Sequence, residues 1–289
     1  MDARRYRFYK ETALNSVPYL LMLILFLVVL ELVGQRAWEW CMERMSLFDL
    51  FVVGGFGFYM VLFWGLAAIY LRLTYTKRPA WLYRYKIQGN EDPDRIKVPL
   101  RKSILVVLGN QVFGTLPFLI GVYALMVARG YDASQAVPPW YIALFHVVMM
   151  VLLQDVFFFL SHRLLHVKWF FRRFHRIHHE YRESVAIATH YVHYVEHIVG
   201  NLFPVFIGAV IFLPHPFVIL FWIQLIVMNA LHTHGGFAIP FMSYAVHHDF
   251  HHYNVDGNYS SIGLTDRIFG TDTAFRDMER SASEGGEVA

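Results

Sequence analysis

Four long apolar runs constrain this 289-residue chain more than any other feature of its sequence. They cover residues 17–33, 50–70, 103–128 and 140–160. A helix needs about 20 apolar residues to cross the roughly 30 Å hydrocarbon core of a bilayer, so each run predicts a membrane-spanning helix. The first run is too long for a signal peptide and has no cleavage site, so we expect it to remain as an anchor. A content of 56% hydrophobic and 16% charged residues excludes an ordinary soluble domain.

A fifth apolar stretch, residues 198–231, is interrupted by Pro-His-Pro at 214–216. Each half has about 15 to 16 residues, which is short for a full crossing, so we expect a short membrane hairpin. The pattern predicts an all-α integral membrane protein with four transmembrane helices, this hairpin and a helical, histidine-rich cap. Residues 1–102 would form an N-terminal anchor with a basic loop, residues 103–279 the functional domain, and residues 280–289 a disordered tail.

The distribution of Lys and Arg predicts the orientation. With four spans and a returning hairpin, all but three of the 25 basic residues lie on one side of the membrane; the exceptions are Arg36, Arg44 and Arg129. By the positive-inside rule the basic side is cytoplasmic, in a bacterial inner membrane or an endoplasmic reticulum. The mild net charge of +3 thus reports orientation, and we expect no nucleic-acid partner.

Histidine is the most unevenly distributed residue: all 16 lie between His146 and His252, and three short motifs hold nine of them. In HRLLH, a spacing of four puts two imidazoles on one helical face. In HRIHH and HHDFHH, the third and fourth residues after a histidine diverge sideways, so adjacent histidines can reach two different metal ions. The ligand candidates of these motifs are His162, His166, His175, His178, His179, His248, His251 and His252.

The metal type follows from the ligands. Imidazole suits iron, zinc, copper and nickel, whereas Mg²⁺ and Ca²⁺ prefer oxygen. A zinc site usually needs four ligands, so this many histidines predict two ions. The single cysteine, Cys41, excludes an iron–sulfur cluster and a thiolate zinc site. Acidic residues near the motifs are candidates to accept the second ring N–H of ligating histidines; these are Asp155, Glu196 and Asp249.

The remaining histidines are less specific. His190, His197, His232 and His247 lie between or beside the motifs and are possible further ligands. His146 lies inside the fourth span and His215 lies between two prolines, which favours structural or channel roles for both.

HRLLH, HRIHH and HHDFHH, in this order and followed by GNYSSIGLTDRIFGT, resemble the fatty acid hydroxylase and sterol desaturase superfamily, and within it the C4-methylsterol monooxygenases. The resemblance covers about residues 85–273. It implies a non-haem di-iron centre that activates O₂ and attacks a C–H bond of a lipid, and it adds His193 and His234 to the ligands. The chain departs from methylsterol oxidases in reading HYVHYVE for EYAHPLE, with His190 for the acid and Tyr194 for the proline.

The implied reaction is hydroxylation or desaturation, with a C4-methylsterol as the first substrate candidate. Two Fe ions would be the active cofactor, and zinc could replace them on overexpression because imidazole binds both. The sequence contains no CxxCH or GxGxxG motif, so electrons from NAD(P)H must arrive through a partner, which the family implies is cytochrome b5 or a ferredoxin. Alternatives are a fatty-acyl, alkylglycerol or carotenoid oxidase and, outside enzymes, a metal transporter.

A lipid substrate must reach a centre just outside the bilayer. We expect an apolar path between the fourth span and the hairpin, closed by the segments that carry HRIHH and HHDFHH. The candidates to line this path are Phe157, Phe158, Phe203, Phe206, Phe221 and Trp222.

Overall fold

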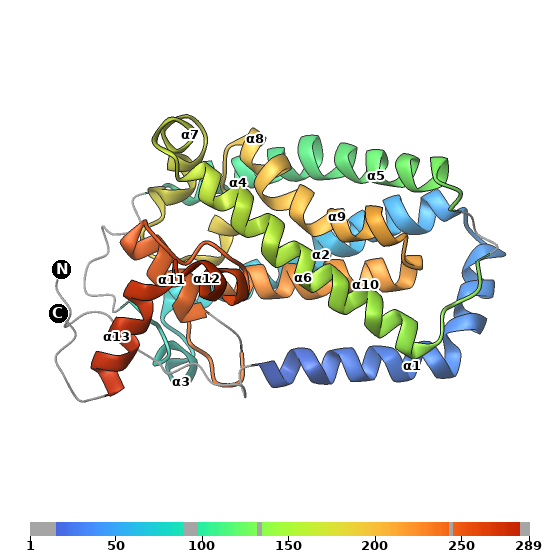
Figure 1. Cartoon of the computed structure of the whole chain (residues 1–289), viewed down its shortest axis with the longest axis horizontal. Coiled ribbons are helices and arrows are strands. Elements are labelled where there is room, and N and C mark those ends of the chain that lie inside the picture. The colour runs from blue at the N-terminus through green and yellow to red at the C-terminus, as the bar shows by residue number, and fades with distance from the viewer. Residues whose placement is uncertain (1–15, 89–97, 132–134, 243–244, 284–289) are drawn as a thin grey trace.

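The computed structural model describes residues 16–88, 98–131, 135–242 and 245–283 (Figure 1), and within these ranges the regular secondary structure is helical. Six helical segments there are long and apolar enough to span a membrane. They are α1 (Val17–Met42), a π-helical turn with α2 (Asp49–Thr76), α4 through α5 (Leu100–Ala128), α6 (Trp140–Leu165), α8 through α9 (Tyr194–Phe212) and α10 (Pro216–Thr233). The predicted all-α membrane fold is therefore confirmed.

The predicted hairpin differs in length from the observed one. Its two helices have 19 and 18 residues, each enough to count as a full span. The first helix begins at Tyr194 and includes Glu196 and His197, which are buried inside the protein. Because these two residues are polar, the apolar run in the sequence starts after them and the predicted span is shorter than the helix. They are tolerated in the helix because they are buried in protein. The second helix begins at Pro216, after His215 caps it by accepting a hydrogen bond from Phe217 N.

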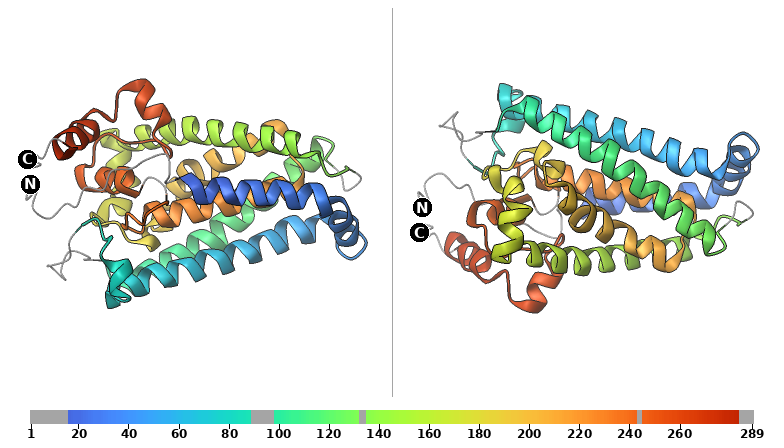
Figure 2. Two further views of the ribbon diagram at one scale, coloured as in Figure 1. Left: turned by 90° about the horizontal axis from the view of Figure 1, so that it is seen from below. Right: turned by 90° about the horizontal axis from the view of Figure 1, so that it is seen from above.

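The segments outside the spans gather at one end of the bundle, on the left in Figure 1, and the same arrangement is visible in both views of Figure 2. They are α3 (Ala80–Tyr83), α7 (Lys168–Arg173), the 3₁₀ turns His175–Glu180 and Ala186–His190, α11 (Ala245–Asn254), α12 (Leu264–Phe269) and α13 (Thr273–Ser283). We call this group the cap. The loops that follow α1 and α5 lie at the opposite end. The histidine motifs thus lie at the end of the bundle where the basic loop residues gather.

Two helix pairs build the core of the bundle. α6 packs against α9, and α10 packs against α2. Tyr70 of α2 lies with its hydroxyl 2.8 Å from Nδ1 of His232 on α10, and both side chains are buried. α2 is therefore part of the protein core, in addition to any anchoring role. Leu25 of α1 and Val61 of α2 are among the many apolar side chains on the outside, as lipid contact requires.

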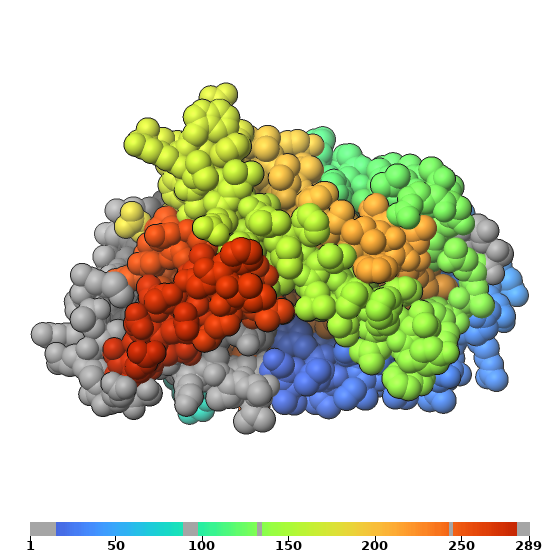
Figure 3. All heavy atoms as spheres, viewed as in Figure 1, coloured from blue at the N-terminus to red at the C-terminus, as the bar shows by residue number. Residues whose placement is uncertain are grey.

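The C-terminal helices cover the cap end of α6, and α7 projects from the same end (Figure 3). α13 continues to Ser283, so the first four residues of the segment expected to be a disordered tail are helical. The rest of that segment, residues 284–289, lies outside the described residues.

Candidate metal centre

Two groups of histidine nitrogens lie side by side in the cap. Within each group the candidate ligand atoms are all within 4.8 Å of one another. All of these histidines except His166 are buried. The first group contains His162, His166, His175, His179 and His251, and the second contains His178, His234, His248 and His252. The structure thus brings together nine of the ten histidines that the sequence and the family resemblance selected.

Two of the three motifs divide their histidines between the groups, as their spacing requires. HRLLH ends α6 and gives both of its histidines to the first group. In the 3₁₀ turn His175–Glu180, His178 belongs to the second group and its neighbour His179 to the first. In α11, His251 belongs to the first group and His252 to the second. Adjacent residues point in different directions on a helical turn, which is how one short segment reaches two sites.

The ring nitrogens in each group face one another at ligand spacing. In the first group, Nε2 of His175 lies 3.0 Å from Nε2 of His166 and 3.0 Å from Nε2 of His179. In the second, Nε2 of His248 lies 2.8 Å from that of His234 and 3.2 Å from that of His252. Neighbouring ligands of an ion with metal–nitrogen distances of about 2.1 Å are roughly 3.0 to 3.4 Å apart, for octahedral to tetrahedral angles. The two groups therefore fit two ions.

Hydrogen bonds at the other ring nitrogen set the tautomers. A carbonyl oxygen can only accept, so a ring nitrogen beside it must carry the proton. Nδ1 of His162 donates to Tyr259 O at 2.8 Å, and Nδ1 of His251 donates to Gly257 O at 2.7 Å. The same arrangement pairs His252 with Tyr181 O and His234 with Ala230 O. In these four residues Nε2 keeps its lone pair for a metal ion.

The electrostatic environment keeps the histidines neutral. Burial is the main cause that lowers the pKa of His175, His178 and His179 well below its usual value, and neighbouring histidines lower it further. The pKa of His166 falls to about 2 for the same reasons. A neutral imidazole is the form that binds a metal ion. The site is therefore preorganised as a set of ligands.

Of the three predicted acidic partners, Glu196 contacts a ligand candidate directly. Its Oε1 lies 2.7 Å from Nδ1 of His175, and both side chains are buried. Asp249 accepts a hydrogen bond from Gln88 Nε2 at 3.0 Å. Asp155 accepts hydrogen bonds from Ser261 N and Thr265 N, so it holds the loop that follows α11. Asp155 thus holds backbone near the centre and Asp249 holds the Gln88 side chain, with no hydrogen bond from either to a histidine found among the described residues.

The other predicted histidines lie outside both groups. His193 caps the helix that starts at Tyr194, because its Nδ1 accepts from Val195 N at 3.1 Å, and it belongs to neither group. Four possible ligands have other partners: His190 contacts Tyr59, His197 contacts Thr115, His232 contacts Tyr70, and His247 lies 3.8 Å from Asp266. His146 and His215 lie in α6 and at the start of α10.

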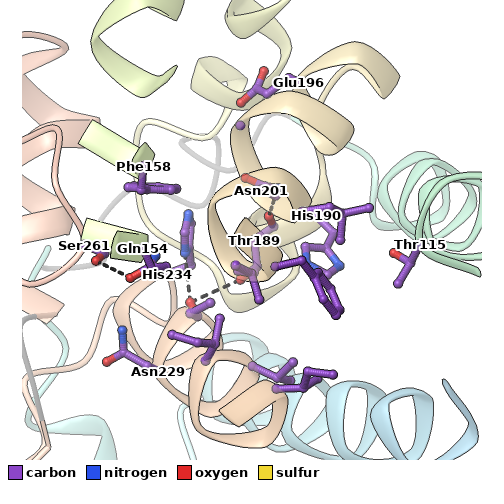
Figure 4. A pocket seen from close by; sticks show the side chains of 18 of the residues that line it. Thr115, Gln154, Phe158, Thr189, His190, Glu196, Asn201, Asn229, His234 and Ser261 are labelled. Atoms are coloured by element: carbon purple, nitrogen blue, oxygen red, sulfur yellow. Dashed lines mark hydrogen bonds between the residues drawn. The ribbon is translucent and has the colours of Figure 1, made fainter. Parts of the chain in front are cut away.

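A cavity extends from the second histidine group into the membrane bundle. Its volume is about 140 Å³, roughly ten times what is needed to hold one water molecule. His162, His175, His178, His234 and His248 line its cap end, while Leu119, Phe206, Ile223, Ile226 and Val227 give it apolar walls. Figure 4 shows His234 and Thr189 between Gln154 and Ser261 on one side and His190 and Thr115 on the other.

The predicted channel residues divide into two sets. Phe158 and Phe206 line the cavity. The other four are not among its lining residues: Phe157 packs against Phe203, Phe221 stacks on Phe26, and Trp222 is buried with its Nε1 donating to Val205 O. Alternate aromatic residues on a helix face different neighbours, and the sequence alone does not show which face turns to the cavity.

Sequence reasoning missed the polar residues that the second and third spans contribute. Tyr59 and Thr115 line the cavity, and Gln111 is completely buried behind Tyr59. The available signal was the presence of polar side chains within apolar spans, since such groups are costly in lipid and face the protein interior.

Comparisons with known proteins agree with this geometry. A family model described as fatty acid hydroxylase matches residues 147–271, which include all nine histidines of the two groups. The Homo sapiens protein named fatty acid hydroxylase domain-containing protein 2 is 30% identical over 230 residues, which cover 80% of this chain and 69% of that protein. No solved structure matches the chain.

Two relatives carry the name methylsterol monooxygenase. Methylsterol monooxygenase 1 of Rattus norvegicus is 32% identical over 207 residues, covering 68% of this chain and 69% of the rat protein. Methylsterol monooxygenase 2-2 of Arabidopsis thaliana is 28% identical over 268 residues, covering 88% of this chain and 97% of the plant protein. The similarity to the plant protein therefore extends well beyond residues 147–271.

Proposed function

This chain belongs to the fatty acid hydroxylase family, and from that premise we propose that it is a membrane-bound di-iron oxygenase acting on a lipid. It is an oxidoreductase of the fatty acid hydroxylase type and an integral membrane protein. It uses O₂ and external electrons to hydroxylate or desaturate a C–H bond. The observation that carries the proposal is the position of two groups of neutral histidines at the end of an apolar cavity.

The histidines would hold the metal ions through their Nε2 atoms. The first group would hold one ion and the second group the other, with the backbone carbonyls of Tyr259 and Ala230 keeping His162 and His234 in the required tautomer. Bound iron supplies the reduction of O₂ and the attack on an unactivated C–H bond. Because the imidazoles are neutral, they would leave the positive charge of the ions largely intact.

The cavity supplies the remaining requirements of such a reaction. Its apolar walls bind hydrocarbon and exclude water from the reacting carbon. Phe158 and Phe206 lie among these walls, and Gln154 in the same lining accepts a hydrogen bond from Ser261 Oγ at 2.7 Å. The chain itself therefore binds, orients and shields the lipid.

Electrons must come from outside the chain. Its sequence has one cysteine and no haem-attachment or dinucleotide motif. We infer that cytochrome b5 or a ferredoxin, driven by NAD(P)H and a reductase, docks at the cap, which faces the cytoplasm. Arg172, Arg173 and Arg176 are exposed there and would attract an acidic carrier.

The similarity to proteins named methylsterol monooxygenase makes a C4-methylsterol the first substrate to test. Fatty-acyl, alkylglycerol and carotenoid lipids are the other substrate classes to test. A metal transporter would place its ligands along a path near the bilayer midplane, whereas these ligands gather at one end of the bundle.

The test is aerobic turnover of protein purified from iron-supplemented cells, with a chemical reductant and each lipid class in turn, followed by mass spectrometry of the products. We expect one class to gain an oxygen atom or lose two hydrogens, and we expect two metal ions per chain. The His178→Ala variant should form no product. A chain that holds two ions and oxidises none of the lipids would contradict the proposed function.

A further inference from the structure

A hydrogen-bond relay inside the membrane bundle ends at the cavity. It begins at Trp64, whose Nε1 lies 2.9 Å from Gln111 Oε1. Gln111 Nε2 donates to the Tyr59 hydroxyl at 2.9 Å, and that hydroxyl lies 3.0 Å from Nδ1 of His190. Gln111 and Tyr59 are buried, and Tyr59 and His190 both line the cavity. Four side chains from three separated segments thus form one continuous relay.

The relay has a direction because an indole nitrogen can only donate. Trp64 must meet the oxygen of the Gln111 amide, so the amide NH₂ faces Tyr59 and donates to its oxygen. We take the phenol hydrogen to be donated to Nδ1 of His190, 3.0 Å from the hydroxyl oxygen. Thr115, which also contacts Tyr59, completes the network with its hydroxyl 2.8 Å from Nε2 of His197. An imidazole that accepts at Nδ1 carries its proton at Nε2.

The Nε2–H of His190 is available to a ligand. Burial and the neighbouring His197 lower the pKa of His190 well below its usual value, so the ring is neutral. Phe63 stacks on the ring at a centroid separation of 4.8 Å and fixes its plane. Among the described residues no hydrogen-bond partner of Nε2 is found, and the side chain is partly accessible where it lines the cavity.

His190 also lies near the second histidine group. The carbonyl of Ala230 accepts from Nδ1 of His234 at 2.8 Å and from the hydroxyl of Thr189 at 3.3 Å. Figure 4 shows these two bonds and the position of His190 beside Thr189. A ligand atom bound at His190 would therefore lie close to the candidate metal centre, with apolar walls around the rest of the ligand.

We propose that His190 is a specificity-determining residue that donates a hydrogen bond from Nε2 to an oxygen atom, hydroxyl or carbonyl, of the lipid in the cavity. Tyr59 and Gln111 are positioning residues that hold the imidazole in this tautomer. The inference rests on the proposed function for the identity of its ligand as a lipid substrate. It predicts that the oxidised carbon lies close to an oxygen-bearing carbon of that lipid.

Binding of matched lipids tests this without turnover. One series is cholesterol, its ketone cholestenone and the oxygen-free cholestene; the other is stearyl alcohol, octadecanal and octadecane. Affinities are measured by equilibrium binding to the purified full chain in detergent. In at least one series we expect the oxygen-bearing lipids to bind at least about tenfold more tightly than the hydrocarbon, because a buried donor without a partner is costly. Comparing the alcohol with the carbonyl compound identifies which oxygen is preferred.

Variants separate the role of His190 from a structural one. His190→Phe keeps the stacking on Phe63 but has no N–H, so the affinity ratio should fall to about one. His190→Gln retains a donor and should restore part of the ratio, and Tyr59→Phe should reduce it several-fold because the tautomer is no longer fixed. His146→Phe is the matched control at a histidine that does not line the cavity, and it should leave the ratio unchanged. Metal content should be the same in all four.

Three results would overturn the inference. The first is an affinity ratio of oxygen-bearing lipid to hydrocarbon that is equal in the wild type and His190→Phe. The second is a loss of metal in His190→Phe as complete as in His178→Ala. The third is that no oxygen-bearing lipid from either series binds. If the proposed function alone fails, the affinity ratio remains while no oxidised product forms in air with reductant.

Discussion

Nε2 of His251 lies 3.3 Å from Nε2 of His179, although 72 positions separate the two residues in the chain. A similar long-range contact joins Nδ1 of His252 to the carbonyl of Tyr181 at 2.9 Å. α11 and the 3₁₀ turn that carries HRIHH therefore approach each other over both histidine groups. Because neighbouring histidines of each segment belong to different groups, neither group is complete until both segments are in place.

This sharing makes single ligands decisive for metal binding. We expect His178→Ala and His251→Ala each to lower the metal content and to abolish turnover, since each removes one ligand candidate from a group. Elemental analysis of the purified variants, together with the turnover assay, measures both effects. His146→Ala is the control, because His146 belongs to neither group, and it should keep most of the metal. An equal loss of metal in all three variants would contradict this division of roles.

We expect Glu196 to affect metal affinity through its contact with His175. Its Oε1 accepts from Nδ1 of His175, which directs the lone pair of Nε2 to the first group. Glu196→Leu removes the acceptor, and we expect metal affinity to fall by about 10- to 100-fold, as is common for partners of ligating histidines. Glu196→Gln retains an oxygen that can accept and should lose much less. Competition with a chelator of known affinity gives the values, and equal affinities in the two variants would show that the acceptor is unimportant.

The stability of the metal-free protein should depend on pH. Burial lowers the pKa of His248, His251 and His252 well below its usual value, as it does for the HRIHH histidines. In the unfolded chain these groups bind protons below about pH 6.5, while the folded state keeps them neutral. Acid therefore favours unfolding, by up to about 1.4 kcal/mol per pH unit for each such histidine.

Thermal unfolding in detergent at about pH 7.5 and about pH 5.5 checks this dependence. The unfolding temperature should fall clearly on acidification, and bound metal should raise it near neutral pH, because the ion binds only the folded arrangement. An unfolding temperature that is the same at both pH values would mean that the buried histidines are not neutral in the folded state.

Much of the membrane fold could be predicted from apolar runs, because lipid imposes them locally. The first span begins at Val17 as expected, but it continues to Met42, since a helix can leave the hydrocarbon before it ends. The first helix of the hairpin was predicted too short because Glu196 and His197, near its start, are buried in protein. Hydropathy does not distinguish a polar residue that faces protein from one that ends a span.

The candidate site was predictable to the extent that it depends on local spacing. HRIHH and HHDFHH divide their histidines by helical geometry alone. By contrast, His193 was assigned to the metal through family resemblance, whereas its position makes it a helix cap. The contact between Tyr59 and His190 joins residues 131 positions apart, and no local pattern indicates it.

The last prediction concerns the shape of the cavity. Phe158 and Phe206 line it, whereas Phe221 stacks on Phe26 at a centroid separation of 4.0 Å outside the cavity lining. Phe158→Ala enlarges the cavity and Phe206→Trp narrows it, so both should change the relative rates at which lipids of different size are oxidised. Neither residue offers a ligand to a metal ion, and metal content should stay at the wild-type value.

Phe221→Ala is the matched control for these two variants, because it removes an aromatic side chain outside the cavity lining. It should lower stability by about 1 kcal/mol through the lost stacking on Phe26 without altering the ratio of products. Competition between two lipids in one reaction, followed by mass spectrometry, gives that ratio directly and is insensitive to the amount of active protein. If Phe158→Ala and Phe206→Trp leave the ratio unchanged while Phe221→Ala shifts it, lipids reach the metal ions by another path.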